Sequence, residues 1–198
     1  MSAEVPYIRE RTQAERDESY RSSYWMHALE YGLNYYVCGR FAVAARMMPV
    51  SASLFHHAVE LLLKACLALD DLVEEIAKYD ETYGHSLPLL WEEFRKRNPG
   101  SEEHDPTIED LHKFELVRYP ENLISEGGMF SIGFFENLEQ EPNSYRRFTL
   151  STLQIDPLVA LLMKASSYNP VLLKDMLARE PLKTYYELHN QVAITKNA

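Results

Sequence analysis

Glu60 and Lys64 are the residues whose types and spacing most directly suggest chemistry in this sequence. Residues four apart lie on one face of a helix, and an acid placed before a base favours an ion pair. The neighbouring residues are strongly apolar, so we expect the pair to be partly buried. Either it is a structural ion pair, or Lys64 or Glu60 lines a groove between helices and contacts a ligand or a partner chain.

Pairs of arginine and histidine could support cleavage of RNA without a metal. The histidine would transfer a proton at the 2′-hydroxyl, and the arginine would stabilise the charged transition state. Two pairs have four to six intervening residues: Arg97 with His104, and Arg21 with His27. Such matches arise by chance at about this frequency, and a Pro-Gly turn follows Arg97 closely. Arg97 and His104 are the better catalytic candidates, because Arg21 and His27 lie within a predicted first helix.

His56, His57 and Glu60 have a spacing that could place metal ligands on one helical face. A metal site needs three or four ligands, and no motif in the sequence supplies the others. Histidines on an apolar helix are usually hydrogen-bonded packing residues. We therefore predict neither a metal site nor a cofactor.

The charge balance excludes one class of partner. The chain has 30 acidic and 20 basic side chains among 198 residues, which gives a formal net charge of -10. Non-specific binding to duplex DNA or to an anionic membrane needs the opposite balance, because it depends on cations that neutralise phosphates. We expect neither partner, although a local basic patch is compatible with the composition.

The termini and cysteines predict an intracellular protein. The N-terminal residues are charged and lack the apolar core of a signal peptide. The longest strongly apolar stretches fall well short of the roughly 20 residues that span a bilayer. Cys38 and Cys66 lie in apolar helical contexts, so we expect buried, reduced thiols. A cytoplasmic location follows as an expectation.

Apolar residues recur every three or four positions over most of the chain, and only seven glycines occur, which favours helices. A polar lead-in covers residues 1–16, and a long first helix runs from about Asp17 until Pro49 stops it. Ser51 or Ser53 is expected to cap a second helix, whose apolar residues cover more than half its surface. That helix should therefore be central.

Later helices are predicted from their start and stop signals. Ser86 begins a third helix that runs to about Arg97, the segment 98–106 forms an exposed loop, and a fourth helix runs from Thr107 or Pro106 to about residue 118. Residues 121–150 form an irregular insertion, with a small hairpin or an ordered loop. Asp156 is expected to cap a helix over 156–168, and short helices follow at 170–178 and 181–189.

These elements predict a single all-α domain over residues 17–198. We expect an up-and-down bundle of four to five helices, with the irregular insertion and the short C-terminal helices added to it.

Four segments, in order, resemble the HEPN family of helical domains. They are FAVAAR at 41–46, HAVELLLKA at 57–65, GHSL at 84–87 and RYPEN at 118–122. The resemblance covers about residues 20–125. It implies a helical bundle that binds a nucleotide or single-stranded RNA, forms a homodimer, and has a nucleotidyltransferase as a partner in some systems. The ligand-binding residues that it suggests are Glu60, Lys64, His85, Arg118 and Tyr119.

Catalysis is the point at which this sequence departs from ribonuclease members of the family. No histidine follows Arg118 within the expected four to six residues. We therefore expect a non-catalytic, dimeric binding module. An endoribonuclease of a toxin–antitoxin or phage-defence system is the alternative. A structural or adaptor protein, whose tyrosine-rich first helix binds another polypeptide, is the second alternative.

Overall fold

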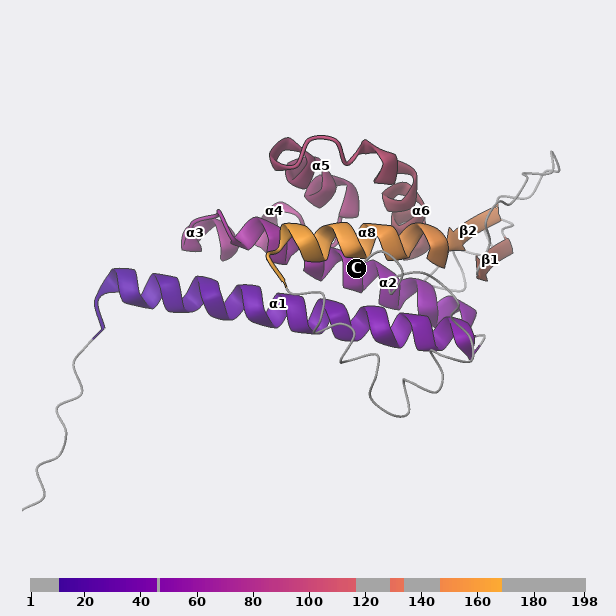
Figure 1. Ribbon diagram of the computed structural model, residues 1–198, viewed down its shortest axis with the longest axis horizontal. Coiled ribbons are helices and arrows are strands. Elements are labelled where there is room, and N and C mark those ends of the chain that lie inside the picture. Colours follow the sequence, from indigo (N-terminus) through magenta and orange to yellow (C-terminus); the bar gives the residue numbers. More distant parts are fainter. Residues whose placement is uncertain (1–10, 46, 117–128, 134–146, 169–198) are drawn as a thin grey trace, which may run out of the picture.

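The computed structural model describes residues 11–45, 47–116, 129–133 and 147–168 (Figure 1). Its elements are α1 (Gln13–Ala44), α2 (Met48–Ala68), α3 (Val73–Ile76), α4 (Tyr79–Thr82), α5 (Leu87–Arg97), the 3₁₀ turn η1 (Glu102–His104), α6 (Asp105–Leu116), β1 (Met129–Gly133), β2 (Arg147–Ser151) and α8 (Thr152–Ala165). The predicted all-α bundle is confirmed, with one small pair of strands at an end of it.

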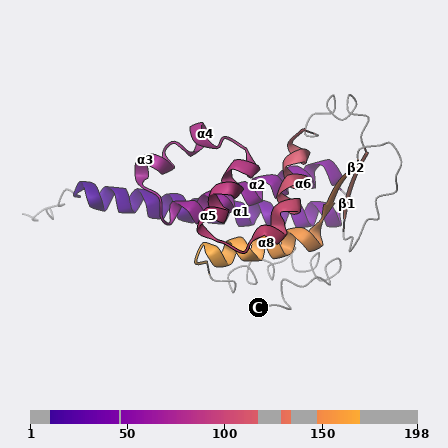
Figure 2. The ribbon, with the colours of Figure 1, turned by 90° about the horizontal axis from the view of Figure 1, so that it is seen from above.

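Helix α2 is the centre of the bundle. It packs along α1 and also contacts α5, α6 and α8 (Figures 1 and 2). Its apolar residues face several neighbours at once: Phe55, Leu62 and Leu63 are fully buried, and Leu61 is half-buried. The broad apolar surface of this segment predicted that position, since a helix with apolar residues on most sides must be covered on most sides.

Helix α1 begins earlier than its pattern predicted. Thr12 accepts a hydrogen bond from the backbone of Glu15, whose side chain in turn accepts one from the backbone of Thr12. This capping box satisfies backbone donors that the first helical turn leaves open. The predicted start at about Asp17 is therefore four residues too late, and the helix includes the last residues of the segment 1–16, for which a polar lead-in or a frayed helix was expected. The first turns of α1 extend past the rest of the bundle (Figure 2).

Two glycines let α1 and α2 approach closely. A Cβ atom on Gly32 would lie 2.9 Å from Cγ of Leu62, and one on Gly39 would lie 2.8 Å from the ring of Phe55. Contacts that short do not occur between real side chains, so a larger residue at either position would push the helices apart. The pairing of these two helices thus depends on the absence of two side chains.

The junction between α1 and α2 differs from the prediction. Helix α2 begins at Met48 with a proline in its first turn, and neither Ser51 nor Ser53 caps it. Proline suits a first turn, because the amide hydrogen that it lacks would have no partner there. Pro49 therefore starts the second helix, and the first has already ended at Ala44.

One stretch of α2, Val50–Ala68, has the length and composition of a membrane-spanning helix. The expectation that no apolar stretch reaches that length is wrong for this segment. Within the bundle, 72% of the stretch is buried by protein. That burial is the property of a core helix, which passes the same test of length and composition.

The two strands pair in parallel, with Met129 opposite Arg147 and Gly133 opposite Ser151. A hairpin requires antiparallel strands, so the predicted hairpin is wrong for the two described strands, β1 and β2. Parallel neighbours need a longer crossover connection. The residues that connect them, 134–146, lie outside the described ranges, as does the rest of the predicted insertion up to residue 128.

Helix α8 begins at Thr152 and continues through Pro157, so Asp156 is not its cap. The side chain of Asp156 instead points into the core. The segment predicted as an exposed loop is partly buried, since Ser101 and His104 are covered. Of the two thiols, Cys66 is buried as predicted, whereas Cys38 is exposed. The helices predicted at 170–178 and 181–189 lie outside the described residues.

Candidate functional site

The central ion pair of the candidate site joins Glu60 and Lys64, as the sequence predicted. Nζ of Lys64 lies 2.9 Å from Oε1 of Glu60, and both side chains are only 4% exposed. The same ammonium group donates to Oδ1 of Asp80 at 3.0 Å, and the side chain of Asp80 is 91% exposed. Lys64 is thus held between two carboxylates and is not presented to solvent. This geometry favours the structural one of the two roles that its spacing allowed.

Two histidines cover the open side of Glu60. Nδ1 of His85 lies 3.2 Å from Oε2 of Glu60, and Nδ1 of His57 lies 3.5 Å from the same oxygen. The two rings are edge to face, with centroids 6.2 Å apart. The side chain of His85 is 64% exposed and that of His57 is 27% exposed. Each ring therefore has its Nδ1 turned to the buried acid, and neither Nε2 has a partner among the described residues.

The electrostatics of this cluster keep Glu60 ionised. Burial opposes the charge, but hydrogen bonds with His57 and Lys64 and the charge of Lys64 outweigh burial and bring the pKa of Glu60 to about 2. Burial also opposes the charge on Lys64, yet its hydrogen bonds with Glu60 and Asp80 raise its pKa. A fixed carboxylate behind two imidazoles orients them and favours a donating hydrogen on each Nδ1.

A stripe of aromatic residues on α1 borders this cluster. Tyr24, Tyr31 and Tyr35 follow one another at spacings of seven and four, so they share a flank of the helix. The ring of Tyr35 lies 5.5 Å from that of His57. Burial, and then the charges of Asp80 and Glu60, raise the pKa of Tyr24, which places it beside the same cluster. Tyr31 and Tyr35 are exposed.

A buried histidine holds the segment that carries His85. Nε2 of His56 lies 3.1 Å from the backbone carbonyl oxygen of His85, and Nδ1 lies 3.2 Å from that of Leu111 in α6. His56 is almost fully buried. It is therefore the hydrogen-bonded packing residue that the sequence predicted, and it ties α2 to the residues before α5.

The catalytic candidates Arg97 and His104 are not brought together. Nη1 of Arg97 lies 2.6 Å from Oδ1 of Asp71, and Nη2 lies 3.0 Å from Oε1 of Glu93. His104 is buried with its ring edge on to Trp91, and burial lowers its pKa. Within the described ranges the two residues share no contact, because α5 ends at Arg97 and the chain turns away.

The other sequence candidates occupy separate places. Arg21 pairs with Glu18, whereas Nδ1 of His27 lies 2.6 Å from the backbone oxygen of Ser23. That histidine contacts the ring of Tyr31 and so belongs to the border of the aromatic stripe. Arg118 and Tyr119 lie outside the described residues. No group of three or more metal ligands occurs in the described part of the chain.

Sequence reasoning missed two parts of this arrangement. Asp80 has no sequence signal that links it to Lys64, since it lies sixteen residues away in a separate short helix. The second is a buried ion pair between α1 and α8, in which Nη1 of Arg40 lies 3.0 Å from Oδ2 of Asp156. The hydroxyl of Tyr36 donates to Oδ1 of the same aspartate at 2.7 Å.

Comparison with protein-family models, with curated protein sequences and with solved structures finds no significant match to this chain. The resemblance to the HEPN family therefore stays a prediction from the sequence. The candidate site stands on its own geometry: a buried Glu60–Lys64 pair, two outward-facing histidines, and exposed tyrosines beside them.

Proposed function

We propose that this chain is a binding module for single-stranded RNA, and that His57, His85, Tyr31 and Tyr35 form its binding surface. The observation that carries the proposal is the pair of imidazoles whose Nδ1 atoms face Glu60, with side chains that are 27% exposed in His57 and 64% exposed in His85. Because Nδ1 of each ring already donates to Glu60, the outer nitrogen can donate to a phosphate oxygen when the ring is an imidazolium, in which both nitrogens carry a hydrogen. The exposed tyrosine rings beside them offer faces on which unpaired bases stack.

The charge of the surface favours a single strand over a duplex. Lys64 is neutralised by Glu60 and Asp80, so the remaining attraction for phosphate comes from the two histidines. A chain with a net charge of -10 cannot rely on non-specific attraction to the closely spaced phosphates of a duplex. Stacking on aromatic rings instead requires bases that are free of a partner strand.

Tyr35→Ala and the double variant His57→Ala/His85→Ala are expected to weaken binding of a fluorescein-labelled single-stranded RNA of about 10 nucleotides. Loss of one stacked base costs roughly 1–3 kcal/mol, so the dissociation constant of Tyr35→Ala should rise by about 5- to 100-fold. Fluorescence anisotropy measures it. Circular dichroism of each variant checks that the helices are intact.

Met26→Ala and Lys113→Ala are the matched controls for this experiment. Met26 is exposed on another flank of α1, and Lys113 is an exposed cation that pairs with Asp110 in α6. Both variants should bind the RNA like the unchanged chain. Equal binding by Tyr35→Ala, or tighter binding of the corresponding duplex, contradicts the proposal.

The histidine pair also supports a second candidate function, which is cleavage of the bound RNA. One neutral imidazole would take the proton of a 2′-hydroxyl while its oxygen attacks the adjacent phosphorus. The other, as imidazolium, would give a proton to the departing 5′-oxygen. The products are a 2′,3′-cyclic phosphate and a 5′-hydroxyl, so no metal or further reactant is consumed.

If the chain cleaves RNA, His57→Ala and His85→Ala should each slow cleavage by about 10²- to 10⁴-fold. Gel analysis of labelled RNA, incubated with a chelator of divalent cations, measures the rate. Arg97→Ala and His104→Ala should leave that rate unchanged. Intact RNA after incubation with the unchanged chain removes this candidate and leaves the binding function.

The homodimer and the nucleotidyltransferase partner remain predictions from the family resemblance. The exposed ring of Tyr20 on α1 lies outside the histidine cluster and offers apolar area for contact with another chain. A single light-scattering measurement of the molar mass in solution tests the dimer.

A further inference from the structure

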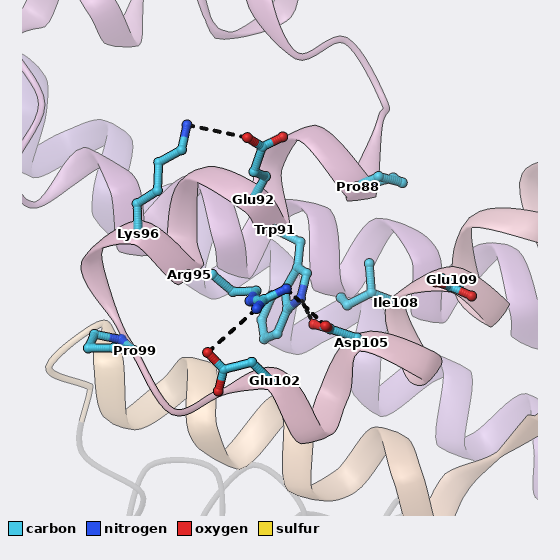
Figure 3. Close-up of a pocket in the computed structure, with 10 residues that line it drawn as sticks. All are labelled: Pro88, Trp91, Glu92, Arg95, Lys96, Pro99, Glu102, Asp105, Ile108 and Glu109. Carbon is cyan, nitrogen blue, oxygen red and sulfur yellow. Dashed lines mark hydrogen bonds and ion pairs between the residues drawn. The ribbon is translucent and has the colours of Figure 1, made fainter.

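A cavity of about 540 Å³ lies between α5 and the segment formed by η1 and α6 (Figure 3). None of the residues of the proposed RNA-binding surface lines it. The indole of Trp91 and the side chain of Ile108, both buried, belong to its lining. The remaining lining residues are Pro88, Glu92, Arg95, Lys96, Pro99, Glu102, Asp105 and Glu109.

One guanidinium group is already bound inside this cavity. Nη1 of Arg95 donates to Oδ2 of Asp105 at 2.9 Å, and Nη2 lies 3.5 Å from Oε1 of Glu102 (Figure 3). The indole nitrogen of Trp91 donates to the other oxygen of Asp105 at 2.7 Å, which fixes that carboxylate. The cavity is therefore built to hold a flat cation against carboxylates.

The cavity has more negative charge than its own cations neutralise. Its lining contains four carboxylates and two basic side chains, which leaves an excess of two negative charges. Arg95 forms ion pairs with Asp105 and Glu102. Lys96 lies closer to Glu93, at 3.1 Å, than to the lining residue Glu92, at 3.6 Å.

Glu109 contributes to this excess, because its carboxylate has no hydrogen-bond or ion-pair partner in the part of the chain that the structure describes. It borders the cavity from α6, whereas Glu92 borders it from α5 (Figure 3). Pro88 and Ile108 lie on the same side as Glu109 and provide apolar surface between the two acids. An elongated cation with an apolar stem fits such a lining.

We propose that this cavity docks an arginine side chain of a partner polypeptide. The three methylene groups of the arginine lie along Pro88 and Ile108, and its guanidinium bonds Glu109. Glu92, on the other side of this apolar surface, adds negative charge that attracts the same cation. Arginine is favoured over lysine because its planar fork matches carboxylates in two directions, as Arg95 does within the same cavity. The net charge of -10 attracts a basic partner toward this surface.

The full chain has two tryptophans, Trp25 and Trp91, and the test follows the signals of their indole N–H groups by nitrogen-15 NMR. Trp25→Phe assigns the remaining signal to Trp91. The probe is the blocked peptide acetyl-Gly-Arg-Gly-amide, and the corresponding lysine and glutamate peptides are compared with it. We expect a saturable shift of the Trp91 signal with the arginine peptide, half-saturation at a higher concentration with lysine, and no shift with glutamate.

Glu92→Gln/Glu109→Gln should raise the half-saturation concentration by roughly fivefold, as expected for the loss of one ion pair and of a second negative charge at a partly exposed site. Glu103→Gln is the matched control. Glu103 is exposed and does not line the cavity, so this substitution removes a neighbouring negative charge without changing the lining. It should leave the titration unchanged. An equal effect of Glu103→Gln, or no effect of the double variant, overturns the proposal.

Free guanidinium ion provides the remaining arm of the test. An equal shift at the same concentration of guanidinium chloride would mean that the cavity takes a small cation and does not dock a side chain, which also overturns the proposal. The proposed RNA-binding function is independent of each of these outcomes, because its ligand is an anion and its residues lie elsewhere.

Discussion

Replacing Lys64 with Met lowers the free energy of unfolding by about 3–5 kcal/mol at pH 7, because it leaves the carboxylate of Glu60 buried without its principal cation. Both side chains are 4% exposed, so water cannot replace the lost partner. His57 and His85 contact the same carboxylate but compensate only when they carry a proton. Urea unfolding followed by circular dichroism measures the loss.

Asp80→Asn is the matched control, since it removes the second carboxylate of the same lysine. Asp80 is 91% exposed, and an exposed ion pair contributes about 1 kcal/mol or less. The double variant Glu60→Leu/Lys64→Met should recover most of the loss, because two apolar side chains need no partner. A loss in Lys64→Met no larger than that in Asp80→Asn would contradict a structural role for the pair.

The pH dependence of stability offers a further readout of the same pair. The pKa of Glu60 in the folded chain is about 2, below its ordinary value of 4.5. The folded state therefore holds this proton more weakly than the unfolded chain does, and the contribution of Glu60 is present above pH 4.5 and lost as the pH falls from 4.5 toward 2. The loss over this window should be smaller in Glu60→Leu/Lys64→Met.

Arg40→Met and Asp156→Ala are each expected to cost about 3–5 kcal/mol at pH 7, because each leaves a charge behind in the core. The two atoms Nη1 and Oδ2 lie 3.0 Å apart, and both side chains are nearly fully buried. This pair joins α1 to α8. Its loss should therefore loosen the packing of α8, which urea unfolding detects as a lower midpoint.

The two variants should respond differently to pH. Burial raises the pKa of Asp156 to about 6 from its ordinary value of 3.8, against the influence of Arg40 and Tyr36. Because the folded state binds this proton more tightly, the contribution of Asp156 rises as the pH falls through 6 toward 3.8. Arg40→Met should thus recover part of its stability at about pH 5, where the aspartate becomes neutral.

Asp156→Ala should not recover at any pH, because a guanidinium cannot give up its proton in a protein. Tyr36→Phe is the milder control, since it removes one neutral donor from Asp156 and should cost about 1 kcal/mol. Identical pH profiles for Arg40→Met and Asp156→Ala would show that the charge of Asp156 does not control the attachment of α8.

The elements that sequence reasoning located best are those with a repeated pattern. The apolar residues of α2 predicted a central helix, and Ser86 with the following proline predicted the start of α5 at Leu87. Boundaries that depend on one polar residue were less predictable. Asp156 has the type and position of a helix cap, but the helix begins before it, because a buried partner on α1 uses its carboxylate.

The residues of the candidate site likewise divide into those that the sequence predicts and those that it does not. Glu60 and Lys64 were predictable as a pair, because a helix brings residues four apart together whatever surrounds it. His85 was suggested only by the family resemblance, and Asp80 had no signal at all. Each comes from a segment whose place depends on how α2 packs against the residues before α5, to which His56 contributes a hydrogen bond.

The amino-acid sequence by itself therefore determined the helical class, the central helix and the ion pair along its length, because periodicity and short-range spacing act within one helix. Only the tertiary structure decided which acids share Lys64, which histidines face Glu60, and that Arg40 meets Asp156. Apart from the contact of His57 with Glu60, which lies three residues away in the same helix, those contacts join residues 16 to 116 positions apart, and burial sets their strength. Local spacing does not encode which side chain of another helix a residue will contact. It also does not encode how far that residue will be exposed to water, because both depend on how the helices pack.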